Sequence, residues 1–119
     1  MQSYKELIVW QKSRKLVKLA YQVTEPFPKG ELFGLTSQIR RAAVSIPANL
    51  AEGYTRKHRK EYIQFVRVAY ASGAELETLF VLSSDLGFIK LAELEEIQAL
   101  LDEIMRMLNK LVSTLMAKP

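Results

Sequence analysis

Residues 91–116, LAELEEIQALLDEIMRMLNKLVSTLM, carry the clearest structural pattern in this chain of 119 residues. Their large apolar residues recur at alternating intervals of three and four: Leu94, Ile97, Leu101, Ile104, Leu108, Leu111 and Leu115. This spacing places one apolar stripe along a single face of an α-helix. A helix with such a stripe packs along its whole length against antiparallel neighbours. The stretch therefore favours a helical bundle and predicts a helix from about Leu91 to Met116.

Helical periodicity continues through the rest of the chain, and strand signals are weak. A first helix is predicted from Tyr4 to Thr24. Ser3 and Glu6 have the spacing of a capping box at its start. Pro26 and Pro28 end the helix because neither can donate the next backbone hydrogen bond. We expect its inward stripe to be Leu7, Trp10, Val17, Tyr21 and Thr24.

A second helix is predicted to start between Glu31 and Thr36 and to end near Gly53. Pro47 falls inside it, so we expect a kink or a short unwound turn there. The apolar stripe of this helix is Leu35, Ile39, Ala42, Ile46 and Leu50.

A third helix is predicted over residues 59–86, and Gly87 is suited to the left-handed conformation that ends many helices. Helices of this length joined by short loops favour one domain, residues 1–119, with an all-α fold. The predicted architecture is an up-down-up-down antiparallel four-helix bundle.

Composition limits the functions open to such a bundle. Apolar residues make up 49% of the chain and charged residues 25%, which is typical of a globular protein. The chain has no cysteine and one histidine, His58, which excludes thiol chemistry, di-iron sites and most His-based catalysis. No phosphate-binding glycine loop, N-terminal signal sequence or long apolar span is present. We expect a cytoplasmic, non-enzymatic protein with no catalytic residue, metal, cofactor, small-molecule substrate or membrane association.

Charge is distributed unevenly along the chain. Residues 1–67 hold 13 Lys and Arg against five Asp and Glu, whereas residues 68–119 hold four against eight. The first half therefore carries a net charge of +8 and the second half −4, in agreement with +4 overall. A basic half favours nucleic acid or an acidic partner. The alternative is that the two halves attract each other within the bundle or between subunits.

The densest basic run lies between the second and third helices and reads RKHRK over residues 56–60, flanked by Tyr54 and Tyr62. Cations at a bundle end suit contacts with phosphate, and Tyr54 is placed to stack on an unpaired base. The same pattern also describes a solvated loop, and His58 fits such a loop better than it fits a catalytic role. The residues predicted to bind nucleic acid are Arg56, Lys57, Arg59, Lys60 and Arg67, with cations of the first helix in support.

A set of polar residues is predicted to meet where the second and third helices touch. We expect Arg41 to pair with Glu75 or Glu52. Two interpretations remain open: a polar network that holds the helices in register, or a binding or catalytic pocket. The full set is Gln38, Arg41, Ser45, Asn49, Glu52, Ser72 and Glu75.

The third helix has more apolar residues than a single buried stripe along one face would require. Between Val66 and Leu86 its only charged residues are Arg67, Glu75, Glu77 and Asp85. A helix in a four-helix bundle keeps an outer face, and a contiguous apolar outer face is uncommon unless a partner covers it. We therefore expect self-association. The predicted interface residues are Val68, Leu79 and Leu82.

The stretch GLTSQIRRAAVSIPANLAEG, residues 34–53, resembles the 23S rRNA intervening-sequence protein family, also called four-helix bundle proteins. Shorter matches are LIVW at residues 7–10, KEYIQF at residues 60–65 and ASGAELE at residues 71–77. The resemblance covers roughly residues 4–89. It implies a small bacterial cytosolic protein with a four-helix bundle fold, no enzymatic activity and a homopentameric ring. The family usually has Ser or Thr in place of His58, so the cap of the third helix is either lost here or moves to Thr55.

These observations predict a non-enzymatic oligomer that binds RNA through the basic loop and the first helix. The alternative is a structural or protein-interaction hub whose basic half faces an acidic protein partner.

Overall fold

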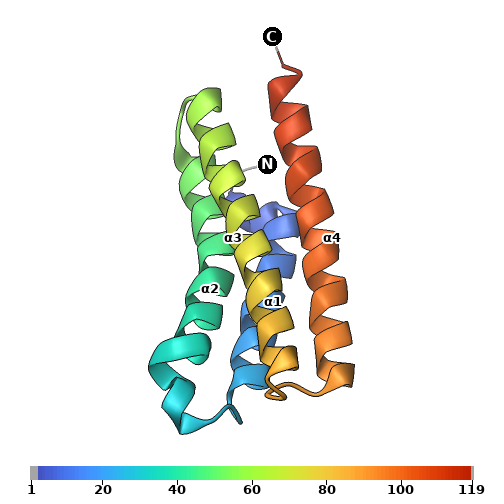
Figure 1. Ribbon diagram of the computed structural model, residues 1–119. Coiled ribbons are helices and arrows are strands. Elements are labelled where there is room, and N and C mark those ends of the chain that lie inside the picture. The colour runs from blue at the N-terminus through green and yellow to red at the C-terminus, as the bar shows by residue number, and fades with distance from the viewer. Residues whose placement is uncertain (1–2, 119) are drawn as a thin grey trace.

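The computed structural model describes residues 3–118, so Met1, Gln2 and Pro119 lie outside the described residues. Its four long helices alternate in direction and connect through short segments (Figure 1), which confirms the predicted all-α, up-down-up-down four-helix bundle. The bundle measures 49 × 23 × 20 Å. Its helices are α1 (Ile8–Thr24), α2 (Ser37–Thr55), α3 (Arg59–Asp85) and α4 (Leu91–Met116).

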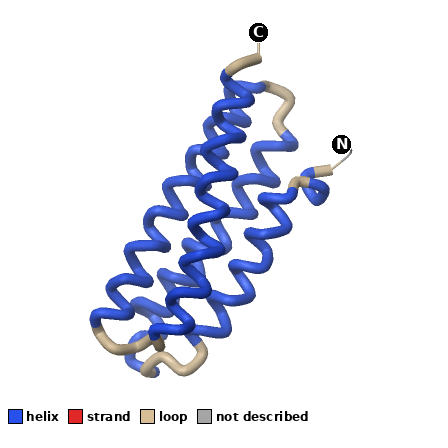
Figure 2. The backbone as a smooth tube through the Cα atoms, turned by 90° about the vertical axis from the view of Figure 1, so that its right-hand side faces the viewer, coloured by secondary structure: helices blue, strands red, loops and turns tan. Residues whose placement is uncertain are grey.

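Helix α4 follows its apolar stripe as predicted. Ile97, Leu101, Ile104 and Leu108 are almost fully buried, because each faces the space between α1 and α3. No helix within residues 3–118 combines the length and hydropathy that crossing a lipid bilayer requires. The four helices lie side by side along the long axis of the bundle, and the segments that join them lie at its two ends (Figure 2).

The first helix differs from its prediction in two ways. The capping box of Ser3 and Glu6 forms, but it closes a separate 3₁₀ turn, η1 (Tyr4–Glu6). Leu7 is extended (φ −68°, ψ 124°) and separates that turn from α1. The buried residues of α1 are Val9, Ser13, Leu16, Ala20, Val23 and Thr24.

The predicted inward stripe of α1 is correct at Thr24, which is buried, but its larger residues lie about a quarter turn, at 100° per residue, from the face that is buried. Trp10 and Val17 are half-buried, and Tyr21 is exposed. The inward face carries the fully buried small residues Ser13 and Ala20, whereas the larger amphipathic rings of Trp10 and Tyr21 remain partly exposed.

Two short turns lead from α1 into α2: the 3₁₀ turn η2 (Lys29–Glu31) and the π-helical turn η3 (Leu32–Thr36). Glu31 caps η3, since its carboxylate accepts a hydrogen bond from the Leu35 N–H at 3.2 Å. Helix α2 continues through Pro47 without an unwound turn, so of the two outcomes predicted there the unwound turn does not occur. The backbone instead departs from helical geometry at Gly34, before α2 begins.

Helix α3 starts at Arg59, with His58 as an N-cap that makes no side-chain hydrogen bond. The cap is lost rather than moved, because the Thr55 hydroxyl donates to the Glu52 carbonyl at 2.8 Å. At its other end Gly87 is left-handed with φ 76°, as predicted.

Candidate nucleic-acid interface at the basic end of the bundle

The basic loop forms one end of the bundle, opposite the loops that join α1 to α2 and α3 to α4 (Figure 1). Every side chain from Arg56 to Lys60 is exposed. Up-down topology also brings the last turn of α4 to this end, so Lys118, the last residue that the structure describes, lies beside the start of α3. The cations at this end of the bundle therefore come from two regions far apart in the sequence, the loop at residues 56–60 and Lys118.

Arg56 is oriented by two contacts. Its guanidinium lies 3.3 Å from the Glu52 carboxylate, one helical turn earlier. The same group sits 5.0 Å above the centre of the Phe65 ring, in a cation–π arrangement. The ion pair is exposed and contributes little to stability, but together the two contacts restrict where Arg56 points.

The α3 and α4 side of this end holds a pocket of about 350 Å³. Arg59 and Lys60, which are adjacent at the start of α3, line it together with Arg67, about two helical turns later. Arg59 donates a hydrogen bond to the Lys118 carbonyl at 2.7 Å, and Arg67 reaches the Met116 sulfur at 3.2 Å. Predicted nucleic-acid residues thus converge on one hollow.

The two tyrosines that flank the loop pack against each other. Their ring centres are 5.9 Å apart and nearly perpendicular, in an edge-to-face contact between α2 and α3. Both rings are half-buried. Burial, and secondarily the neighbouring Tyr54, raise the pKa of Tyr62 above its ordinary value of 10.0. Tyr54 is thus a supported ring at the edge of the basic end rather than a freely projecting one.

Cations of α1 lie farther along the bundle. Helix α1 begins well below the loop at the basic end and runs away from it (Figure 1). Lys12 is paired with Glu103 of α4 at 3.1 Å, so one contact between the basic and acidic halves of the chain lies within the bundle.

The polar set on α2 and α3 is only partly connected. Ser45 and Ser72 share a hydrogen bond between their hydroxyls at 2.8 Å, and the Asn49 amide donates to the Ser45 hydroxyl at 2.9 Å. Gln38, Arg41 and Glu75 border a pocket of about 400 Å³ beside them. Within residues 3–118 no ion pair joins Arg41 to Glu75 or Glu52, because Glu52 pairs with Arg56 instead.

The predicted interface residues divide between surface and core. Val68 and Leu82 are each 45% exposed on the outer surface of α3. Leu79 is only 6% exposed and belongs to the core of the single chain, so its assignment to an interface is wrong. The reason is its position on the helix, where it faces the other helices of the bundle rather than solvent.

Sequence reasoning missed the contribution of the last turn of α4 to the basic end. The signal was available in principle, since an up-down bundle places the end of its fourth helix beside the start of its third. In the part of the chain that the structure describes, no group of three or more acidic or histidine side chains is placed to hold a metal ion.

Comparison with known proteins supports the same fold. The family model described as 23S rRNA-intervening sequence protein matches residues 5–110. A crystal structure from Bacteroides thetaiotaomicron VPI-5482, of a protein with unknown function from the S23 ribosomal protein family, has a similar fold. That similarity has a TM-score of 0.80 and 23% sequence identity, and covers 88% of this chain and 98% of the other. No curated protein matches the chain. Because the family model spans most of the sequence, the chain belongs to the 23S rRNA-intervening sequence protein family.

Proposed function

We propose that this chain is a cytoplasmic, non-enzymatic, oligomeric protein that binds RNA through the basic end of its bundle. The observation that carries the proposal is the convergence of Arg59, Lys60 and Arg67 on one hollow, beside an exposed loop that adds Arg56 and Lys57. Closely spaced cations bind the phosphate backbone by releasing its condensed counterions.

The chemistry of this end suits phosphate better than an enzyme substrate. Its cations are exposed to solvent and the hollow is open, which suits an extended polyanion. The edge-to-face pair of Tyr54 and Tyr62 provides an aromatic surface next to the cations. This arrangement favours RNA with unpaired bases over a regular duplex, because stacking requires an accessible base.

Self-association is the second part of the proposal. Val68, Tyr70, Val81 and Leu82 are each at least 41% exposed along the outer surface of α3. Exposed apolar side chains along one helix favour self-association through that helix. An oligomer, for which the family resemblance implies a homopentamer, repeats the basic end in every subunit. Several weak phosphate contacts then act together and raise the overall affinity.

A pair of charge-reversal variants tests RNA binding. Lys57→Glu with Lys60→Glu removes two exposed cations from the basic end and adds two carboxylates. Lys29→Glu with Lys90→Glu makes the same change of charge in the loops at the opposite end. We expect the first variant to lose roughly tenfold or more of its affinity for a labelled structured RNA, since local phosphate contacts dominate binding.

The variant with Lys29→Glu and Lys90→Glu distinguishes the loss of local phosphate contacts from a change in the net charge of the protein. Equal losses of affinity in both variants would contradict a site at the basic end. An unchanged affinity in the Lys57 and Lys60 variant, with the helical circular dichroism of the wild type, would refute the proposal. Absence of binding by the wild type at low salt would favour an acidic protein partner for the same surface.

A further inference from the structure

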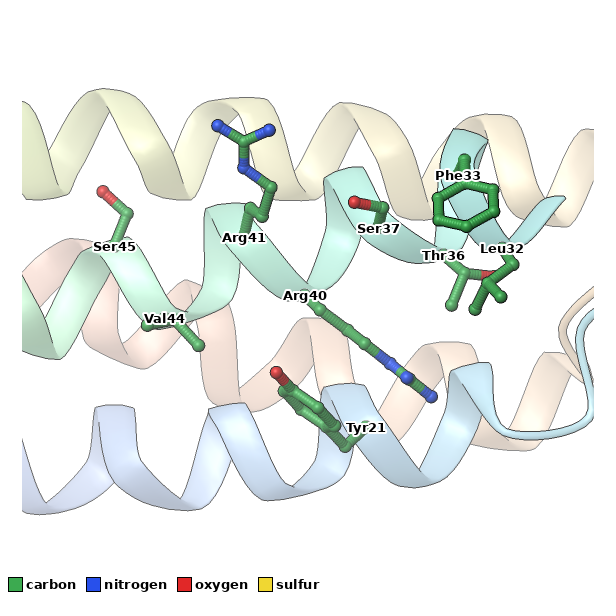
Figure 3. A pocket seen from close by; sticks show the side chains of 9 residues that line it. All are labelled: Tyr21, Leu32, Phe33, Thr36, Ser37, Arg40, Arg41, Val44 and Ser45. Carbon is green, nitrogen blue, oxygen red and sulfur yellow. The ribbon is translucent and has the colours of Figure 1, made fainter.

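Helix α1 has a second apolar stripe that the bundle covers only in part. Trp10, Val17 and Tyr21 lie about a quarter turn from its buried face. They border a groove between α1 and α2. Tyr21 is 44% exposed and faces Val44 of α2, which is 40% exposed (Figure 3).

The floor of this α1–α2 groove is formed by short aliphatic side chains. It consists of Val44, Pro47, Ala48 and Ala51, whose short side chains leave a hollow of about 560 Å³. Past Val44 the groove opens into a second hollow of about 600 Å³. Small residues flanked by larger ones let another helix approach closely, at the usual separation of about 8–10 Å between helix axes.

The rim of the α1–α2 groove is basic. Arg14 and Lys18 line it from α1, and among the residues that the structure describes no acidic side chain lines either hollow. Arg14 lies 5.4 Å from the centre of the Trp10 ring. Within residues 3–118 neither Arg14 nor Lys18 is in an ion pair, so both remain available to carboxylates of a partner. Arg40 is already occupied, since it lies over Tyr21 (Figure 3) and 3.7 Å from Glu25.

The outer surface of α3 has the opposite charge and a matching length. From Val68 to Asp85 its charged residues are all acidic: Glu75, Glu77 and Asp85. None of the three is in an ion pair within the described residues. Exposed apolar residues extend from Val68 to Leu82, about 21 Å at 1.5 Å per residue. The α2 segment along the two hollows, from Ser37 to Ala51, has the same length by the same measure.

We infer that the α1–α2 groove binds the outer surface of α3 from a second copy of this chain. This inference rests on the self-association proposed above and specifies its two surfaces. Apolar residues of α3 then cover the aliphatic floor, while its carboxylates meet Arg14 and Lys18. The contact is heterologous, because each copy contributes a different surface, and repetition of such a contact produces a ring when the rotation closes.

A mixing experiment tests the pairing of these two surfaces. Ala48→Glu fills the groove floor and places a carboxylate opposite an acidic partner, and Leu82→Lys disrupts the α3 surface. We expect each variant alone to sediment as a monomer of 13.6 kDa, and an equimolar mixture at high concentration to form a heterodimer of twice that mass. The mixture retains one intact groove and one intact α3 surface, which is enough for one contact.

Fluorescence locates the contact within the heterodimer. The chain has a single tryptophan, Trp10, which borders the groove. Adding Trp10→Phe to the Ala48→Glu chain leaves the Leu82→Lys chain, with its intact groove, as the sole source of tryptophan emission. We expect that emission to shift to shorter wavelength on mixing, because docking removes water from the ring. Ala99→Glu and Leu91→Lys are matched controls on the exposed surface of α4 and keep the wild-type mass.

Three results would overturn the inference. An Ala48→Glu variant with the wild-type oligomeric mass would show that the groove is not an interface. Two monomeric variants that fail to form a heterodimer would favour α3 pairing with itself, leaving self-association in place. A monomeric wild type would remove self-association altogether, and the RNA titration of the lysine variants would then decide separately whether the basic end binds RNA.

Discussion

The Ser45 and Ser72 hydroxyls lie 2.8 Å apart and join α2 to α3 through a direct hydrogen bond. Both residues are half-buried, and Asn49 adds its amide to the same group. We predict that Ser45→Ala or Ser72→Ala alone lowers the free energy of unfolding by about 1 kcal/mol.

The double variant should lose clearly less than the sum of the two single losses, because both single changes remove the same bond. Urea unfolding of the four proteins measures this coupling. Strictly additive losses would show that the two hydroxyls act independently and that the polar set does not link the helices.

Gly53 is required by the close approach of α2 and α3. A Cβ atom at this position would lie 2.7 Å from the Phe65 Cβ and 3.3 Å from the Tyr62 carbonyl oxygen, neither of which can move without its backbone. Alanine is intrinsically about 1 kcal/mol better than glycine in a helix. We nevertheless predict that Gly53→Ala destabilises the protein by about 1–3 kcal/mol, since overpacking outweighs helix propensity.

Gly30→Ala is the matched control for this substitution. No atom lies within 4 Å of a Cβ built at Gly30, so thermal unfolding of that variant should match the wild type. A Gly53→Ala protein that is more stable than the wild type would contradict the tight contact between α2 and α3.

The missing cap of α3 can be restored by one substitution. His58 has extended backbone geometry (φ −115°, ψ 126°) but makes no side-chain hydrogen bond to the first turn. Glu61 stands three residues later, at the position that completes a capping box. We predict that His58→Ser stabilises the protein by about 0.5–2 kcal/mol. His58→Ala lacks the hydroxyl, and an equal gain in that variant would rule out capping as the cause.

Much of this fold was predictable from the sequence, and the exceptions have physical causes. Helix α4 begins and ends where its stripe of leucine and isoleucine predicts. Burial of that stripe also decides which face of α4 points into the bundle. Helix α1 has two apolar stripes, and the pattern cannot show which one is buried. Its large aromatic residues favoured the wrong stripe, whereas the stripe that is buried includes the small residues Ser13 and Ala20.

The candidate site was predictable only in part. The basic run at residues 56–60 identified the loop, because charge density is visible along the sequence. The hydrogen bond from Arg59 to Lys118 joins residues 59 positions apart, and only the arrangement of the helices reveals it. The pairing of Glu52 with Arg56 rather than Arg41 was predictable from spacing, because Arg56 follows Glu52 by four residues, whereas Arg41 lies about 16 Å away along α2.

Tyr62 should make the stability of the protein sensitive to alkaline pH. Its pKa is raised from 10.0, chiefly by burial, so the unfolded chain loses this proton at a lower pH than the folded chain does. The contribution to stability is therefore complete below pH 10 and is lost as the pH rises through the higher pKa of the folded state.

Unfolding in urea between about pH 9 and about pH 11 measures this loss against Tyr62→Phe, which lacks the ionisable group. We predict a shallower decline for Tyr62→Phe than for the wild type. Identical declines in the wild type and Tyr62→Phe would refute the role of Tyr62.

The central claim is that the basic end binds RNA through phosphate contacts. The most direct measurement is a titration of the wild-type protein into labelled structured RNA at a series of salt concentrations. We predict that affinity falls steeply with salt, with a log–log slope that corresponds to on the order of five or more released counterions. Failure to bind at low salt, or binding whose affinity does not change with salt, would contradict the account.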